Sequence, residues 1–104
     1  MREVLLKKNC RPDMPALLAT QVKALLECVP DWVVKKKELV RTFKFKNYYE
    51  AMAFVNATAW ISHHQDHHPD ITVTYNSVEM RYSTHSAGGL TENDFICAAK
   101  VDLL

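Results

Sequence analysis

The spacing of apolar and polar residues predicts one helix in the N-terminal part of the chain, after an irregular start. Leucine and valine residues recur at helical intervals, which predicts an amphipathic helix over residues 14–28. Asp13 followed by Pro15 is typical of the start of such a helix, with the proline in its first turn. Residues 1–12 show no comparable pattern, so we expect this lead-in segment to be irregular or weakly helical.

Alternation of apolar and polar residues predicts four strands arranged as two hairpins. Residues 32–34 and 39–45 flank a lysine-rich turn, which predicts the first hairpin. Residues 71–75 and 78–83 flank an Asn-Ser turn, which predicts the second. Each hairpin has one apolar side that must be buried against another layer of the protein.

A long helix is predicted between the two hairpins, over residues 48–64. Asn47 followed three residues later by Glu50 resembles a capping box with asparagine as the cap. Pro69 disfavours helical geometry at His68, because a proline ring crowds the residue before it. We therefore expect the helix to fray or end within the cluster of histidines that precedes the proline.

A last helix is predicted after Thr91, with Asp94 three residues on in another capping-box arrangement. Its apolar side is expected to hold Phe95, Ile96, Ala99 and Leu103. The predicted order is α-β-β-α-β-β-α, which indicates an α+β fold. We expect a single domain over residues 1–104, with a four-stranded antiparallel sheet and helices packed on one face.

Charge is unevenly distributed along the 104 residues, although the formal net charge is only +1. Residues 1–50 carry eleven Lys or Arg and six Asp or Glu, and residues 51–104 carry two and six. The basic excess falls on the predicted lysine turn and on the solvent side of a strand, which favours an ordinary solvated surface over a nucleic-acid face. We therefore expect no direct nucleic-acid partner.

The apolar runs and the cysteines point to a cytoplasmic protein. No stretch approaches the ~20 apolar residues that a membrane span needs, so we expect no membrane partner. The three cysteines, Cys10, Cys28 and Cys97, are odd in number and widely spaced, which indicates neither a disulfide scaffold nor a zinc ribbon. A reducing cytosol is the simplest compartment for such a chain.

All five histidines lie between His63 and His85, and this cluster is the main chemical feature of the sequence. His63 and His67 are four residues apart, as are His64 and His68, a spacing that can bind zinc on a helix. A third ligand at a matching spacing is missing, and the proline takes His68 out of helical register. The cluster therefore favours acid/base chemistry without a metal, with structural or solvated histidines as a further alternative.

Proton transfer fits the cluster better than acyl or phosphoryl transfer. Two histidines at a helix end and a third at a strand end can face one cavity from different walls, with Asp66 able to orient a ring and raise its basicity. The chain lacks a Gly-x-Ser-x-Gly nucleophile motif and a phosphate-binding glycine loop.

A longer pattern around these histidines resembles a known family. It reads His63-x3-His67-His68-Pro69-x5-Tyr75-x9-His85-x8-Asp94, with Trp32 before the first hairpin. This run of fixed spacings resembles the pterin-4a-carbinolamine dehydratases over roughly residues 17–102. The lead-in segment resembles that of bacterial members associated with phenylalanine hydroxylase.

The resemblance implies a hydro-lyase that removes water from 4a-hydroxytetrahydrobiopterin to give quinonoid dihydropterin, without a metal or bound cofactor. It implies His67, His68 and His85 as catalytic residues. The pocket positions that it implies are His63, Asp66, Pro69, Ser83, Thr84 and Ser86, and the supporting ones are Asp94, Tyr75 and Trp32. Asp94 is expected to act more as a helix cap than in the chemistry, and some family members carry glutamate where this chain has His63.

The resemblance also implies partners and leaves other functions open. It implies a homodimer or homotetramer and a functional link to phenylalanine hydroxylase, whose spent pterin the enzyme would recycle. Animal relatives act as a dimerisation cofactor for a transcription factor, and some plant relatives resemble Rubisco assembly factors. A protein-interaction role and a dehydratase acting on a molybdopterin-related pterin are therefore the alternatives.

Overall fold

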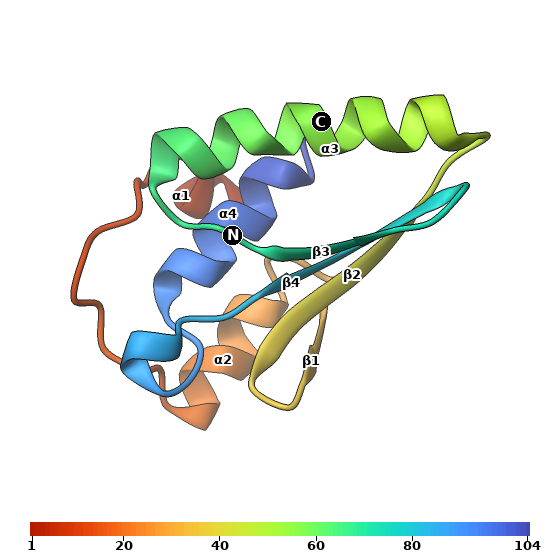
Figure 1. Cartoon of the computed structure of the whole chain (residues 1–104). Helices are drawn as coiled ribbons and strands as arrows, with labels where there is room; N and C mark the ends of the chain where they lie inside the picture. Colours follow the sequence, from red (N-terminus) through yellow and green to blue (C-terminus); the bar gives the residue numbers. More distant parts are fainter.

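The computed structural model describes all residues from Met1 to Leu104, and Figure 1 shows its order of helices and strands. The elements are α1 (Arg2–Leu6), α2 (Ala19–Leu26), β1 (Val33–Lys35), β2 (Glu38–Lys44), α3 (Tyr48–Gln65), β3 (Asp70–Val73), β4 (Ser77–Tyr82), the short 3-10 helix η1 (His85–Ala87) and α4 (Glu92–Val101). No helix combines the length and the apolar character needed to cross a bilayer.

The four strands form one antiparallel sheet in the order β1-β2-β4-β3. Leu39 of β2 lies opposite Tyr82 of β4, and Thr72 of β3 lies opposite Glu79 of β4. Both predicted hairpins are present, and the second hairpin adds to the first through β2 and β4. The predicted α+β fold with a four-stranded antiparallel sheet is therefore confirmed.

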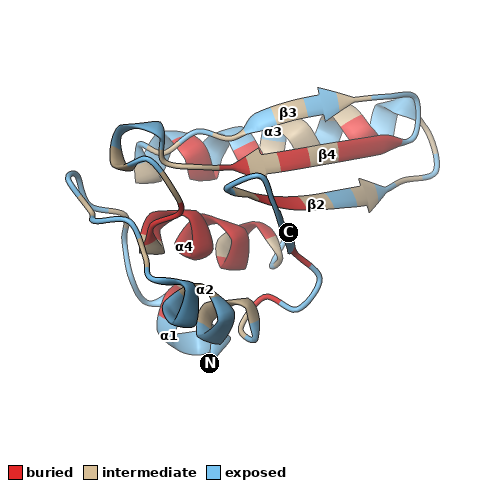
Figure 2. Ribbon diagram, turned by 90° about the horizontal axis from the view of Figure 1, so that it is seen from below, coloured by how far each residue is buried: buried red, intermediate tan, exposed pale blue.

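One face of the sheet carries the core. Leu39, Val78, Met80 and Tyr82 are fully buried, and the helices cover them. On the opposite face Arg81 donates hydrogen bonds to Thr72 and Glu79, and these polar groups stay near the solvent. In Figure 2, α4 is buried along most of its length, between the sheet and the N-terminal helices. The helices thus pack on one face, as the alternation predicted.

The N-terminal part of the chain differs from the expectation. The helix predicted over residues 14–28 begins only at Ala19, so the predicted start at Asp13 is wrong. Asp13 has a left-handed backbone conformation (φ 59°), and the Leu17 N–H donates to the Leu90 carbonyl at 2.8 Å. Residues 14–18 have no regular secondary structure, and this hydrogen bond is a tertiary contact that overrides the helical spacing.

The lead-in segment is weakly helical, as expected: it contains one short helix, α1, whose Leu5 is only 2% exposed. At the other end α4 stops at Val101, and Leu103 is 63% exposed, so its predicted place on the apolar side of the helix is wrong.

Candidate active site

The end of α3 sets the direction of the histidine cluster. The helix ends at Gln65, and Asp66 takes the left-handed conformation that reverses the chain (φ 50°, ψ 43°). The His67 N–H donates back to the Ser62 carbonyl at 3.2 Å, which closes the helix end. His67 therefore leaves the helix and turns toward α4, and the predicted end of the helix within the cluster is confirmed.

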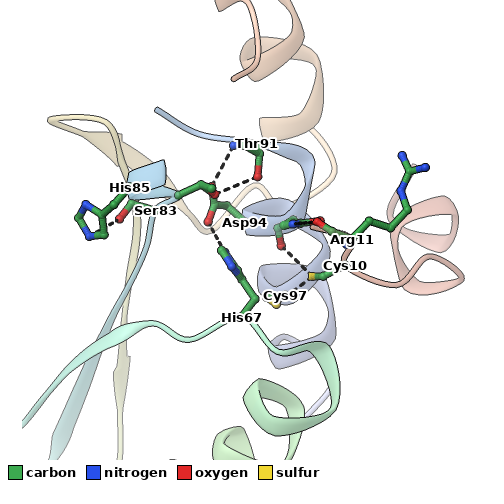
Figure 3. Close-up of polar contacts among 10 residues, drawn as sticks. Cys10, Arg11, His67, Ser83, His85, Thr91, Asp94 and Cys97 are labelled. Atoms are coloured by element: carbon green, nitrogen blue, oxygen red, sulfur yellow. Dashed lines mark hydrogen bonds and ion pairs between the residues drawn. The ribbon is translucent and has the colours of Figure 1, made fainter. Parts of the chain in front are cut away.

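His67 meets Asp94 of α4 at the centre of the site (Figure 3). The His67 Nε2 lies 2.6 Å from Asp94 Oδ1, and the Asp94 side chain is fully buried. The other carboxylate oxygen accepts from the Thr84 hydroxyl at 2.8 Å and from the Thr91 N–H at 2.9 Å. Asp94 therefore caps α4 with one oxygen and binds the imidazole with the other.

The surroundings of His67 favour its protonated form. Burial opposes the charge, but the hydrogen bond to Asp94 and the negative charge of Asp94 outweigh it, so the pKa of His67 is raised. The ring also stacks on Tyr82, with the ring centroids 5.9 Å apart. Because an ionised carboxylate can only accept, Nε2 carries a proton in both charge states. The remaining nitrogen, Nδ1, is then the atom that can exchange a proton with a substrate.

The raised pKa of His67 gives the free energy of unfolding a predictable pH dependence. The protonated imidazole stabilises the folded state fully below its unfolded pKa of about 6.5, and this contribution is lost as pH rises through the folded pKa. Urea unfolding of wild type and His67→Gln is expected to show the largest stability difference near pH 6 and a smaller one near pH 9. A stability difference between wild type and His67→Gln that stays constant from pH 6 to pH 9 would contradict the raised pKa of His67.

Two cavities share Thr84, the residue whose hydroxyl donates to Asp94, as a common wall. The first, of about 300 Å³, is lined by Cys10, Arg11, Pro12, Asp13, Met14, Gln65, Asp66, His67, Thr84, Ser86 and Asn93. The second, of about 280 Å³, is lined by Lys36, Lys37, Glu38, Ser83, Thr84, His85, Gly88 and Gly89. His67 and His85 therefore face neighbouring cavities on the two sides of Thr84.

The structure brings together some of the predicted site residues. Asp66, His67, Thr84 and Ser86 line the first cavity, and Ser83, Thr84 and His85 line the second. In the second cavity the Ser83 Oγ lies 3.3 Å from His85 Nε2. The predicted pocket positions Ser83, Thr84 and Ser86 thus line these two cavities, and Thr84 lines both.

Other predicted site residues lie outside both cavities. His63 is exposed on α3 and His68 is exposed directly after His67, and these two residues and Pro69 line neither of the two cavities. Tyr75 is 67% exposed in the turn between β3 and β4. Trp32 is buried in the core, where its Nε1 donates to Asp102 at 2.8 Å.

The carboxylate that holds the His67 ring by a hydrogen bond is Asp94. Asp66 ends α3, and its negative charge raises the pKa of His67, as expected, but by less than Asp94 does. The capping prediction for Asp94 is confirmed by its bond to the Thr91 N–H. The cap accounts for the contact of one Asp94 oxygen. The contact of the other oxygen with His67 follows only from the packing of α4 against the end of α3.

Sequence reasoning missed the wall that the N-terminal segment supplies. Cys10 and Arg11 line the first cavity beside Asn93 of α4. The Arg11 N–H donates to Asn93 Oδ1 at 3.1 Å, and Asn93 Nδ2 donates to the Arg11 carbonyl at 2.7 Å. The only sequence feature that could have indicated this wall is Asn93, a polar residue at a buried position of the last predicted helix.

The histidines of the cluster do not come together as the ligands of one metal ion. His63 lies within α3 whereas His67 lies beyond its end, so the two do not share a helix face. No group of three or more His, Cys, Asp or Glu side chains is arranged to hold a metal ion.

Comparison with known proteins places this site in a family context. The pterin 4 alpha carbinolamine dehydratase family pattern matches residues 15–104. A protein from Nitrosospira multiformis is 54% identical over 97 residues, covering 93% of this chain and 86% of its own length. One from Chromobacterium violaceum is 52% identical over 102 residues, covering 96% of this chain and 94% of its own. Both are provisionally named pterin-4-alpha-carbinolamine dehydratases.

Solved structures agree with the sequence comparison. A transcriptional coactivator/pterin dehydratase from Brucella melitensis superimposes with a TM-score of 0.80 at 30% identity, over 85% of this chain and 96% of that one. A pterin dehydratase-like protein described as a RuBisCO assembly factor in the alpha-carboxysome gives 0.57 at 27% identity, over 69% and 83%. With the match of residues 15–104, these likenesses show that the chain belongs to the pterin-4a-carbinolamine dehydratase family.

Proposed function

We propose that the protein is a hydro-lyase that removes water from 4a-hydroxytetrahydropterin and yields quinonoid dihydropterin. The observation that carries this proposal is the His67–Asp94 pair at the wall of a cavity of about 300 Å³. That volume is at the lower end of the roughly 300–1,000 Å³ typical of small-molecule sites. Family membership supplies the reaction class, and the pair supplies a histidine suited to proton transfer near neutral pH.

His67 acts in this proposal as the acid for the departing hydroxyl. Asp94 holds Nε2–H and favours the imidazolium, so Nδ1–H is the proton delivered to the 4a-hydroxyl, which leaves as water. A second proton leaves a ring nitrogen of the pterin, and His85 on the other side of Thr84 is the candidate to accept it. No net redox change occurs, because one water is lost and the ring electrons only rearrange.

The remaining predicted residues take binding roles in this proposal. Asp66, Ser83, Thr84 and Ser86 line the pocket around the pterin, and His68 polarises its ring from the rim. His63 and Pro69 shape the outer edge of the site, and Tyr75 and Trp32 support the fold around it. His63 would meet the pterin as an imidazole where some relatives present a carboxylate.

A stopped-flow dehydration assay tests the proposal. We expect the rate of quinonoid dihydropterin formation from 4a-hydroxytetrahydropterin to rise in proportion to protein concentration, above the unaided rate. A metal chelator is expected to leave the rate unchanged, because the proposed chemistry uses only side chains. The same assay on a molybdopterin-related pterin distinguishes the two substrate classes, and absence of any acceleration would refute the hydro-lyase proposal.

A protein-interaction role is the second candidate, and an apolar surface hollow favours it. The hollow, of about 400 Å³, is lined largely by Ala16, Leu17, Ala19, Val22, Val34 and Leu90, and the neighbouring Leu18 is 67% exposed. The names of the two structural relatives, a transcriptional coactivator and an assembly factor, indicate such roles in those proteins. If the protein accelerates the dehydration of neither pterin, the protein-interaction role becomes the favoured one.

The unpaired edges of the sheet bear on the oligomeric state of the protein. The outer edges of β1 and β3 pair with no strand of the chain, and an unpaired edge in water favours pairing with a second copy. We propose a homodimer or homotetramer, measurable by light scattering.

A cytoplasmic single-domain enzyme that serves phenylalanine hydroxylase fits the proposed reaction, and a coupled hydroxylase assay would show faster pterin recycling.

A further inference from the structure

Two thiols far apart in the sequence meet beside the His67 cavity. Cys10 Sγ and Cys97 Sγ are 3.6 Å apart, although 87 positions separate them along the chain (Figure 3). Cys10 is half-buried and lines the cavity, whereas Cys97 is fully buried on α4. We propose that Cys10 and Cys97 form a reversible disulfide when the protein meets hydrogen peroxide, which makes this cavity wall a redox-sensitive modification site.

The contacts around Cys10 hold the pair in place. The Cys10 N–H donates to Gln65 Oε1 at 2.7 Å, and its thiol donates to the Asn93 carbonyl at 3.6 Å. The next residue, Arg11, is bound to Asn93 through two backbone-to-amide hydrogen bonds. These contacts place the segment beside α3 and α4, so the fold itself brings the two sulfur atoms together.

Only a short movement separates the thiols from a bond. The sulfur atoms, now 3.6 Å apart, would approach by about 1.5 Å to reach the ~2.05 Å of a disulfide. Cys10 lies in a segment without helix or strand structure, between α1 and α2, which can move more easily than α4. Closure of the bond would draw this segment toward α4 and change the wall that faces His67.

The two thiols differ in a way that assigns their roles. The hydrogen bond from the Cys97 thiol lowers the pKa of Cys10 against the opposing effect of burial, and the positive charge of His67 lowers it further. The same contact and burial raise the pKa of Cys97 far above its usual range. The thiolate, which is the reactive form, therefore forms on the accessible Cys10.

The oxidation balances with one molecule of hydrogen peroxide. The Cys10 thiolate attacks one peroxide oxygen, the O–O bond breaks, and hydroxide leaves and takes up the proton that Cys10 released. Cys10 is then a sulfenic acid. The Cys97 sulfur attacks the Cys10 sulfur, the S–O bond breaks, and the hydroxyl leaves as water with the Cys97 proton. Two thiols and one peroxide thus give one disulfide and two waters.

Thiol counting on the full chain tests the proposal. The reduced protein has three free cysteines, and peroxide treatment followed by alkylation is expected to leave one. Peptide mapping should find a single linked pair, Cys10 with Cys97, within one chain, and a dithiol reductant should restore all three thiols. Three thiols that stay free, or a bond that involves Cys28 or joins two chains, would overturn the proposal.

Matched variants separate the roles of the three cysteines. Cys28→Ser should form the bond as wild type does, because Cys28 lies apart from the pair, with its Sγ 2.7 Å from the Met1 amino group. Cys97→Ala should stop at the Cys10 sulfenic acid, which a 1,3-diketone traps, and Cys10→Ser should lose no thiol. Trapping of a sulfenic acid at Cys28 in place of Cys10 would contradict the assignment. None of these measurements needs turnover, so they stand even if the dehydratase proposal fails.

Discussion

Replacement of His67 by glutamine is expected to slow 4a-hydroxytetrahydropterin dehydration by roughly 10²–10⁴-fold relative to the enzyme-catalysed rate, the usual contribution of general acid–base catalysis. A glutamine amide can still donate a hydrogen bond to Asp94 Oδ1, which now lies 2.6 Å from His67 Nε2. The amide does not ionise near neutral pH, so it cannot act as a general acid. The variant therefore removes proton transfer while it keeps the buried carboxylate partnered, and stopped-flow kinetics measure the loss.

The choice of glutamine over alanine follows from the burial of Asp94. The carboxylate has no exposed surface, and His67 is its only cationic partner within bonding distance. Removal of one member of a buried ion pair costs about 3–5 kcal/mol, because the other charge stays uncompensated. His67→Ala would thus combine a chemical loss with a large loss of stability, and the melting temperature of each variant must accompany its rate.

Two further variants show whether the loss is chemical. His64→Gln is the matched control, because His64 is exposed on α3, where its ring stacks on Trp60. We expect it to retain the wild-type rate. Asp94→Asn removes the negative charge that raises the pKa of His67, so the alkaline limb of its pH–rate profile should move to lower pH. A His67→Gln variant with the wild-type rate and fold would refute the role of His67 as the acid.

The sequence predicted the local parts of this site and missed its nonlocal contact. The capping role of Asp94 depends on Thr91, three residues away, and such a spacing is visible in a single chain. The contact with His67 spans 27 positions and depends on how α4 packs against the end of α3. The family resemblance placed both residues in one pattern, but only the structure joins them.

The same difference between local patterns and nonlocal contacts explains which parts of the fold were predicted. Alternating residues predicted β4, whose Val78, Met80 and Tyr82 are buried on one side. The helical spacing around Leu17 failed because its N–H bonds to the distant Leu90 carbonyl, which no local pattern reveals. Strands and long helices bury a repeating face, which is visible as a periodic pattern in the sequence. The path of the chain between α1 and α2 depends instead on individual contacts with distant residues.

Replacement of Leu5 by alanine is expected to lower the free energy of unfolding by about 2–5 kcal/mol, the usual loss for a buried leucine. Leu5 is 2% exposed and belongs to the same core as residues of α4, although the lead-in segment offered no pattern that predicted it. The family pattern begins at residue 15 and therefore does not include Leu5.

Urea unfolding of Leu5→Ala beside Val4→Ala measures whether the lead-in segment is part of the folding unit. Val4 is 51% exposed in the same helix, and its truncation should change stability by no more than about 0.5 kcal/mol. Domains of this size have about 5–15 kcal/mol in total, so loss of Leu5 would remove a large share. Equal, small effects would show that α1 is only loosely attached. A large difference would show that α1 anchors the segment carrying Cys10 and Arg11, and hence one wall of the His67 cavity.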